Sequence, residues 1–215
     1  MLIAGLIFFN DEILLLKKCL DSIQGVDRII AVDGTYQDWP HNGVFASSKE
    51  HHDLIRSYQN TTLITTDKPF WHQIDKRNQC LLGDDGDWYL SIDADEEVIF
   101  ASDQGWPSVK AMLASLPSQV AWVDLEFLHR PDLQERGDFI ARKLFKHLPG
   151  IHYAKHHAEL YDGNEVRTAV NSGDDIETPY SGARNQSFFI YHHKIERSYQ
   201  RLNLQGAYYR TRKHP

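Results

Sequence analysis

The chain has 215 residues, of which 41% are hydrophobic and 12% aromatic, enough to build a substantial core in one compact domain. Its formal net charge of -7 argues against a general nucleic-acid binder, although the C-terminal stretch is locally basic. We interpret that stretch as a helix with a solvated basic face. The apolar run at the N-terminus ends at Phe9 and has neither a basic leader nor a cleavage site, so we expect no signal peptide and no membrane span.

The first hundred residues alternate short apolar strands with helices, a pattern typical of an α/β protein with a mostly parallel sheet and helices on both faces. Each predicted strand is a run of apolar or β-branched residues, and each helix has apolar residues at helical spacing or a capping residue at its start. The strands are expected at residues 2–9, 28–34, 61–65 and 88–92, and the helices at 11–23, 48–58 and about 73–82. Asn10 is expected to cap the first helix.

Beyond Phe100 the pattern changes to α+β. We expect helices at 109–116 and 194–210, and strands at 120–127, 139–145, 151–154 and 188–191. Residues 171–184 contain several glycines and aspartates, so they are interpreted as a mobile loop within one domain rather than a linker between two. Cys19 and Cys80 both fall in predicted helices, which favours buried free thiols and a reducing, cytoplasmic location.

An apolar strand runs directly into a cluster of acids that begins with Asp93-Ala94-Asp95. Carboxylates cannot stay buried unpaired, so we expect positive charge beside them. Oxygen ligands of this kind suit Mg²⁺ or Mn²⁺ and leave positions open for substrate phosphates. In an acidic chain such a triplet is more often a solvated turn, but open α/β sheets bind ligands beyond the carboxyl ends of their strands.

Asp33 ends a second strand of the same predicted sheet and is followed by Gly34, which allows a ligand to approach the backbone closely. We therefore expect Asp33 and Asp95 to face one crevice. A turn-forming or helix-capping role for Asp33 is the alternative.

Histidines are frequent, with 12 in the chain, and three pairs stand out: His51-His52, His156-His157 and His192-His193. The first pair is expected on an exposed helix, and the other two lie at the edges of apolar strands where a side chain could reach the metal. A single histidine is more often structural than a ligand, and two such pairs in one small chain reduce that margin. Imidazole together with carboxylate suits Mn²⁺, whereas a zinc cage needs tighter ligand spacing.

Together these segments resemble the family 2 type of glycosyltransferase with the GT-A fold, over residues 3 to 200. The resemblance is carried by a set of short motifs: 10–12, 19–23, 26–34, 76–81, 88–96, 141–145, 150–153 and 156–159. One departure is the run after Asp33, which reads Gly34-Thr-Tyr-Gln-Asp-Trp-Pro and leaves the donor open.

The resemblance implies an enzyme that moves a sugar from a nucleotide-sugar donor, with a UDP-sugar favoured, to an acceptor hydroxyl with inversion. It implies Mn²⁺ or Mg²⁺ on the donor diphosphate, with Asp95 and either His192 or His193 as protein ligands. Asp33 is implied to contact the nucleoside and Asp93 the ribose or sugar. The residues expected on the donor side are Asn10, Asp33, Gly34, Arg77, Asn78 and Asp93.

A single domain over 1–215 is expected, with a nucleotide-sugar half at 1–100, an acceptor-side half at 101–193 and a helix with a basic tail at 194–215. Lys76 and Arg77 are candidates for stabilising the leaving diphosphate. Inverting transfer also needs a carboxylate as general base, for which Glu159 is the first choice, followed by Asp124 and Glu126.

Three alternatives remain open. A nucleotidyltransferase also uses two carboxylates and a divalent metal, although no glycine-rich, lysine-bearing phosphate loop follows the first strand. A hydrolase with a histidine-bound metal would turn over the donor without an acceptor. A non-catalytic nucleotide or sugar binding module would bind without turnover. The acceptor could be a glycan, a protein, a lipid or a modified nucleic-acid base.

Overall fold

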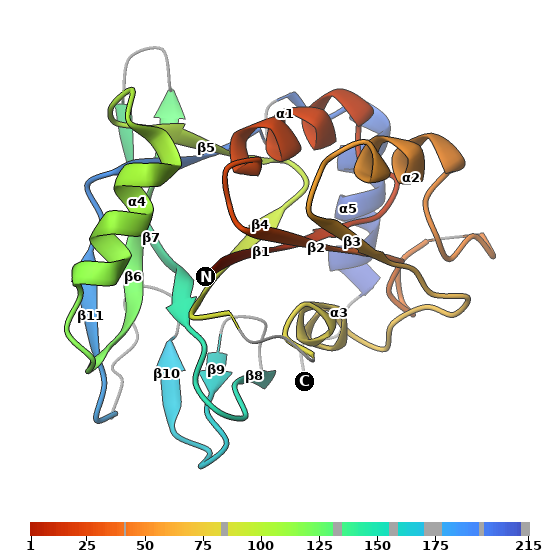
Figure 1. The fold of residues 1–215 in the computed structure, drawn as a ribbon. Helices are drawn as coiled ribbons and strands as arrows, with labels where there is room; N and C mark the ends of the chain where they lie inside the picture. Colours follow the sequence, from red (N-terminus) through yellow and green to blue (C-terminus); the bar gives the residue numbers. More distant parts are fainter. Residues whose placement is uncertain are drawn as a thin grey trace.

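The computed structural model describes residues 1–40, 42–82, 86–130, 135–154, 159–169, 178–193 and 196–211 (Figure 1). Its strands are β1 Leu2–Phe8, β2 Arg28–Asp33, β3 Thr61–Ile64, β4 Trp88–Asp93, β5 Glu96–Phe100, β6 Val120–Arg130, β7 Glu135–Lys146, β8 His152–Ala154, β9 Glu159–Tyr161, β10 Arg167–Ala169, β11 Ser181–Arg184 and β12 Phe188–His192. Its helices are α1 Ile13–Ile23, α2 Lys49–Arg56, α3 Gln73–Gln79, α4 Gly105–Ser115 and α5 Tyr199–Thr211.

One large sheet runs through the molecule in the order β3-β2-β1-β4-β7-β6-β12-β5, and β11 pairs with β6. The first four strands are parallel, as the alternating strand and helix pattern predicts. β7 is antiparallel to both β4 and β6, and β12 is parallel to β6 but antiparallel to β5. The fold is therefore α/β in its first half and mixed beyond it, and a separate small antiparallel sheet, β10-β9-β8, lies below (Figure 1).

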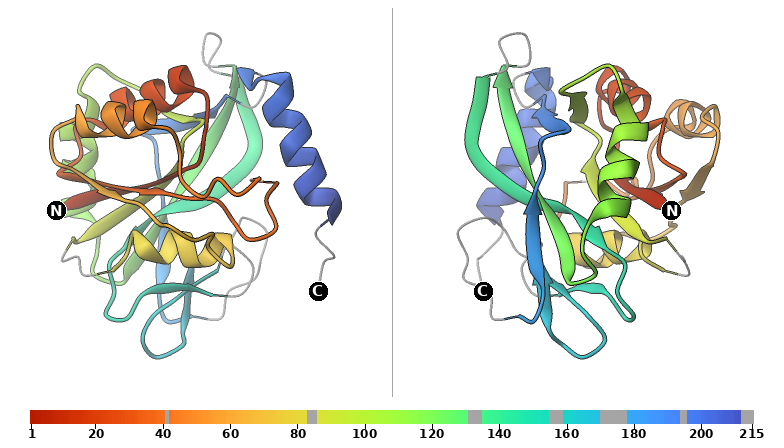
Figure 2. Two further views of the ribbon diagram at one scale, coloured as in Figure 1. Left: turned by 90° about the vertical axis from the view of Figure 1, so that its right-hand side faces the viewer. Right: turned by 60° about the vertical axis from the view of Figure 1, so that its left-hand side comes forward.

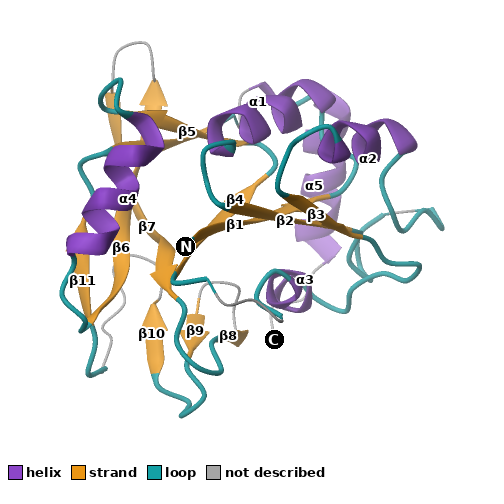
Figure 3. Ribbon diagram, viewed as in Figure 1, coloured by secondary structure: helices purple, strands orange, loops and turns teal. Residues whose placement is uncertain are grey.

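Helices cover both faces of the parallel strands (Figure 3). β1 alternates accordingly: Leu2, Leu6 and Phe8 pack into a cluster with α1, α2 and α4, whereas Ile3 and Ile7 pack into a second cluster with α3, β8 and β9. All seven residues of β1 are buried, because a central strand with two covered faces has no solvent side. The predicted α/β layering with helices on both faces is confirmed.

α5 lies beyond the carboxyl ends of the parallel strands. In the left view of Figure 2, β1 runs from the N-terminus toward this helix. Arg201 of α5 donates to the carbonyl oxygen of Phe9 at 2.9 Å and to the carboxylate of Asp11 at 2.7 Å. Because Phe9 and Asp11 directly follow β1, these contacts bring the C-terminal helix to the edge of the sheet where ligands of α/β proteins bind.

The first helix starts later than expected, at Ile13, and Glu12 rather than Asn10 is its N-cap. Asn10 has a φ of 46°, and its N–H donates to the Ser47 hydroxyl at 2.8 Å. Asp11 accepts from the Phe9 N–H at 2.8 Å, which forms a local turn before the helix. The capping role predicted for Asn10 is wrong because this turn separates the strand from the helix.

Four strands were not predicted. β5 begins at Glu96, inside the acidic cluster, because Lys143 of β7 pairs with the buried Glu96 carboxylate. β9 and β10 are three residues each, too short to show a period. β11 pairs with β6 and contradicts the mobile-loop interpretation for residues 181–184, since backbone pairing does not require apolar side chains.

Both cysteines are buried free thiols, as predicted. Within the described ranges, no helix combines the length and the apolar character that crossing a membrane requires.

Candidate active site

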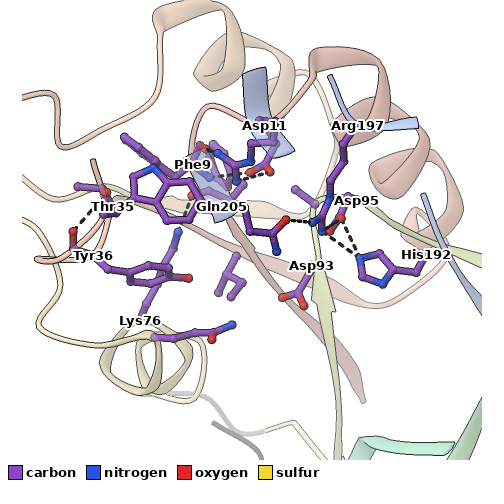
Figure 4. Close-up of a pocket in the computed structure, with 16 residues that line it drawn as sticks. Phe9, Asp11, Thr35, Tyr36, Lys76, Asp93, Asp95, His192, Arg197 and Gln205 are labelled. Atoms are coloured by element: carbon purple, nitrogen blue, oxygen red, sulfur yellow. Dashed lines mark hydrogen bonds and ion pairs between the residues drawn. The ribbon is translucent and has the colours of Figure 1, made fainter. Parts of the chain in front are cut away.

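A cavity of about 200 Å³ opens where β1 and β4 end, and Gln205 of α5 is among the residues that line it (Figure 4). Acidic, basic and aromatic side chains share its wall, and its ends differ. In Figure 4, Tyr36 and Lys76 lie at one end, and Asp93, Asp95 and His192 lie at the other. The lining residues are Ile7, Phe8, Phe9, Asp11, Thr35, Tyr36, Trp39, Gln73, Lys76, Asp93, Ala94, Asp95, His192, Arg197, Arg201 and Gln205.

Asp93 is the last residue of β4 and is held between two cations. Arg77 of α3 donates to its carboxylate at 2.7 Å, and the Lys143 ammonium lies 3.3 Å away. Burial alone disfavours a charged carboxylate, but the charges of Arg77 and Lys143 outweigh it and hold the pKa of Asp93 well below its usual range. Asp93 is therefore an anion at neutral pH, and its charge is already balanced by the protein.

Asp95 lies two residues further on and is faced from the second half of the chain. His192, at the end of β12, places Nε2 2.9 Å from Asp95 Oδ2, and the Arg197 guanidinium donates to the same oxygen. The Asp95 side chain is 6% exposed and that of His192 34%. The structure thus brings Asp95 and His192 into direct contact, and their role as ligands of one metal ion stays a prediction.

His193 points elsewhere. Its Nδ1 lies 2.6 Å from a carboxylate oxygen of Glu196, and its Nε2 lies 2.8 Å from one of Glu97. Only its backbone reaches the site, where its N–H donates to the carbonyl oxygen of Asp95 at 2.9 Å. Neighbouring residues of a strand face opposite sides, so only one member of the pair could face Asp95. His156 and His157 lie outside the described residues.

Asp33 does not line the cavity. Its carboxylate is fully buried and accepts from the backbone N–H of Ser47 at 2.7 Å and from the Ser47 hydroxyl at 2.6 Å, and His52 Nε2 lies 2.7 Å away. These contacts fix the loop that runs from β2 to α2. His51, expected to be exposed, is 7% exposed because its ring contacts Ser48 and the carbonyl oxygen of Asp11.

Gly34 has a φ of 145°, and a Cβ there would come within 2.6 Å of the Thr66 side chain and 2.7 Å of Phe70. Its carbonyl oxygen accepts from Lys76 at 2.6 Å. Glycine at this position therefore serves the packing of two loops over the strand ends.

Asn78 and Arg77, which we predicted to contact the nucleotide-sugar donor, instead form hydrogen bonds with other parts of the protein. The Asn78 side chain pairs with the backbone of Tyr153, accepting at 2.7 Å and donating at 3.0 Å, so it joins α3 to β8. Arg77 is buried and donates to Ser91 at 2.6 Å as well as to Asp93. Both residues act within the protein scaffold, and Arg77 reaches the cavity only through Asp93.

None of the three candidate bases is among the residues that line the cavity. Glu159, in β9, accepts from Tyr161 at 2.7 Å and pairs with Arg167 at 3.4 Å. Asp124 of β6 pairs with Arg142 at 3.1 Å. Glu126 lies on the same strand, two residues beyond Asp124.

The C-terminal basic stretch contributes more than the sequence predicts. Arg197 and Arg201 have side chains only 11% and 18% exposed, and both line the cavity. Arg201 also stacks on Trp39, with 5.0 Å between its guanidinium carbon and the ring centroid. The solvated-face interpretation is wrong for these two residues. The only signal in the sequence was local basicity, which does not specify what a helix faces.

Lys76 was considered only as a cation for the diphosphate. It is 1% exposed, and its ammonium donates to the carbonyl oxygens of Phe8 at 2.5 Å and Gly34 at 2.6 Å. Burial, opposed by the charges of Asp33 and Asp11, lowers its pKa from 10.5 to about 8. It therefore holds together the carboxyl ends of β1 and β2.

No protein-family model matches the chain. A TPR repeat-containing protein of Synechococcus elongatus is 29% identical over 158 residues, which cover 71% of this chain, and the chain spans about a third (34%) of that relative. Among solved structures, TarS of S. aureus, residues 1–349, matches 60% of this chain and 36% of its own with a TM-score of 0.45 and 14% identity. Its complexes with UDP-GlcNAc and with UDP give the same TM-score and identity. At this level of similarity, a functional assignment depends on the residues of the cavity.

Proposed function

We propose that the protein is a divalent-metal-dependent glycosyltransferase of the GT-A type, which moves a sugar from a nucleoside-diphosphate donor to an acceptor hydroxyl with inversion. The observation that carries this proposal is the pair Asp93 and Asp95 at the carboxyl end of β4, in a cavity that also contains His192 and two arginines. Carboxylate, imidazole and guanidinium groups at one end of a cavity suit a metal-bound diphosphate.

The charges support a donor of this kind. Arg77 and Lys143 pair with Asp93, and Lys143 also pairs with Glu96, so Asp95, once Arg197 leaves it, is the carboxylate that remains for a cation. Arg197 and Arg201 also line the cavity, where Arg197 now pairs with Asp95 and Arg201 with Asp11. A site with one carboxylate available to a cation and two guanidinium groups fits a diphosphate that carries its own metal ion.

The ligands present fit a Mg²⁺ or Mn²⁺ ion that arrives with the diphosphate. Among the described residues, no group of three or more acidic, histidine or cysteine side chains could hold a metal alone. Asp95 and His192 provide two ligands, and their facing atoms are 2.9 Å apart. Neighbouring ligands of an octahedral site with bonds of about 2.1 Å lie roughly 3 Å apart, so the spacing is compatible with both atoms binding one ion. Arg197 must leave Asp95 for this to occur.

The chemistry follows from these charges. When bound, the divalent ion supplies positive charge to the leaving diphosphate. Arg197, once displaced from Asp95, can pair with a phosphate oxygen, and Arg201 stays fixed by Phe9 and Asp11. The acceptor hydroxyl loses its proton to a carboxylate as the new glycosidic bond forms and the bond to the diphosphate breaks. Glu159 is our first candidate for that carboxylate, and Asp124 and Glu126 are the alternatives.

The proposal is tested by calorimetric titration of UDP with and without Mn²⁺ into the wild-type protein and its Asp95→Ala and His192→Ala variants. Wild type should bind UDP more tightly with Mn²⁺, Asp95→Ala should lose that gain, and His192→Ala should lose part of it and recover at higher Mn²⁺. Asp53→Ala, which removes an exposed carboxylate of α2, is the matched control. Identical Mn²⁺ dependence in wild type and Asp95→Ala would reject the metal assignment.

Turnover separates a transferase from the alternatives. A UDP-sugar should be hydrolysed slowly without an acceptor and transferred when a suitable acceptor is present. Glu159→Gln should lower kcat roughly 10²–10⁴-fold with little change in donor affinity, because a general base acts mainly in the transition state. If Glu159→Gln kept full activity, Asp124 or Glu126 would become the candidate general base. Binding without any hydrolysis or transfer would favour a binding module.

A further inference from the structure

Lys143 lies between two carboxylates of the acidic cluster. Its ammonium nitrogen is 2.5 Å from both carboxylate oxygens of Glu96 and 3.3 Å from Asp93 Oδ2. Arg77 donates to the other oxygen of Asp93, Oδ1, at 2.7 Å. Glu96 also accepts from the backbone N–H of Asp93 at 2.9 Å, across the turn between β4 and β5. One ammonium group therefore joins both acids.

This contact is shielded from water and charged. The side chain of Glu96 is 3% exposed and that of Lys143 is 17% exposed. Burial disfavours the charge on Lys143, but Asp93 and Glu96 outweigh it and hold the pKa of this lysine above its ordinary value. Lys143 is thus a cation at neutral pH. Its backbone belongs to β7, which lies between β4 and β6 in the large sheet, so the charge is anchored there.

The third acid of the cluster is paired from a different kind of segment. Arg197, which pairs with Asp95, lies between β12 and α5 rather than inside a strand. A metal ion that takes Asp95 has to move a side chain that the sheet does not hold. A metal ion that takes Glu96 would leave the Lys143 ammonium buried without its carboxylate partner, which costs several kcal/mol by the general estimate for a broken buried ion pair, about 3–5.

The position of the ammonium resembles that of a bound metal ion. Mg²⁺ and Mn²⁺ are held in proteins by one or two carboxylates, with water or phosphate oxygens in the other positions. Here the Lys143 nitrogen occupies the point that Asp93 and Glu96 share. A divalent ion at this point would be repelled by the ammonium and would find both acids already paired.

We propose that Lys143 is a positioning residue that acts as a built-in cation: it keeps Asp93 and Glu96 from binding a divalent ion and leaves Asp95 as the metal-binding carboxylate. The inference rests on the proposed function, because it explains how one of three neighbouring acids is reserved for the metal of the donor. It predicts that removing the charge of Lys143 creates a metal site at Asp93 and Glu96.

The test measures Mn²⁺ binding without nucleotide, by calorimetry and by the electron paramagnetic resonance signal of free Mn²⁺. Lys143→Met keeps an apolar stem and removes the charge, so it should bind Mn²⁺ at least about tenfold more tightly than wild type. Adding Glu96→Gln should abolish the gain. Lys146→Met is the matched control, because it removes a lysine of the same strand that donates to the carbonyl oxygen of Ser118, and it should match wild type.

Two further variants separate this inference from a purely structural role and from the proposed function. Lys143→Arg keeps the positive charge and should show no gain in Mn²⁺ affinity. Lys143→Met in an Asp95→Ala background should still show the gain, because the new site uses the other two acids. If Lys143→Met does not fold without metal, Mn²⁺ should restore the circular dichroism spectrum of the folded protein, since the ion replaces the missing charge.

Three outcomes would overturn the inference: unchanged Mn²⁺ affinity in a folded Lys143→Met protein, a gain that persists after Glu96→Gln, or an unfolded variant that Mn²⁺ does not restore. The proposed function fails differently. If wild type does not bind UDP with Mn²⁺ while Lys143→Met gains its Mn²⁺ site, the role of Lys143 as a built-in cation stands and the donor assignment is rejected.

Discussion

Asp33 and Asp95 both follow apolar parallel strands, yet the structure surrounds them differently. Asp33 accepts from a backbone N–H and a hydroxyl and contacts a histidine, all within residues 47–52. Asp95 is faced by His192 and Arg197, two side chains from the distant C-terminal segment. We therefore interpret Asp33 as structural, because nearby residues satisfy it, and propose that a ligand can reach Asp95 by displacing the side chains that face it.

The largest expected effect is the loss of stability when Asp33 is replaced. Asp33→Ala leaves the Ser47 N–H and hydroxyl and the His52 ring without their carboxylate, so we expect a loss of about 3 kcal/mol in the free energy of unfolding. Urea unfolding followed by circular dichroism measures it. Asp53→Ala on the exposed face of α2 serves as the control and should show no measurable change. A stable Asp33→Ala protein with weakened nucleotide binding would instead make Asp33 a ligand residue.

The next effect concerns Arg201, which holds α5 against the end of β1. Arg201→Met removes two hydrogen bonds, to Phe9 and Asp11, and the stacking on Trp39, so we expect a loss of about 2 kcal/mol in the free energy of unfolding. Arg201→Lys keeps the charge but cannot donate to Phe9 and Asp11 with the planar guanidinium geometry, so its free energy of unfolding should lie between those of wild type and Arg201→Met. Equal stability of all three proteins, measured by urea unfolding, would show that α5 is held by other contacts.

A smaller effect separates the two roles assigned to Arg197. Arg197→Gln removes the guanidinium that covers Asp95, so Mn²⁺ alone should bind about fivefold more tightly, while UDP in the presence of Mn²⁺ should bind more weakly. Calorimetry measures both affinities on one preparation, and Arg56→Gln on the exposed end of α2 is the control. If both affinities rose or both fell, Arg197 would not be the group that leaves Asp95 to bind the nucleotide.

The smallest effect is a pH dependence near the start of α5. Lys18 and His193 lower the pKa of Glu196 from 4.5 to about 2. A carboxyl whose pKa is lower in the folded state stabilises the protein above its unfolded pKa, and this contribution disappears as the pH falls from about 4.5 to about 2. Glu196→Gln should therefore be less stable than wild type at pH 6, by under about 1 kcal/mol because the site is partly exposed, and equally stable near pH 2. A difference that stays constant across this range would contradict the assignment.

The sequence predicts much of the first half because its strands are local, apolar and buried on both faces. The position of Asp93 and Asp95 at a strand end follows from Trp88–Ile92 alone. The environment of these acids does not, because Lys143 and Arg197 come from distant parts of the chain and no local period links them. β5 was missed for the same reason, since Glu96 is buried only when Lys143 faces it. Likewise, nothing near Asp33 in the sequence distinguishes a carboxylate held by Ser47 from one that meets a nucleotide.

The paired hydrogen bonds between Asn78 and the backbone of Tyr153 connect the two halves mechanically. α3 carries Lys76, which lines the cavity, and Arg77, which contacts Asp93 in its wall, and β8 belongs to the small sheet whose next strand begins at Glu159. We therefore expect a shift of that sheet to move α3 as well. Deuterium uptake at Tyr153 and along α3 should consequently rise together in an Asn78→Ala variant, since each element then fluctuates without the restraint of the other.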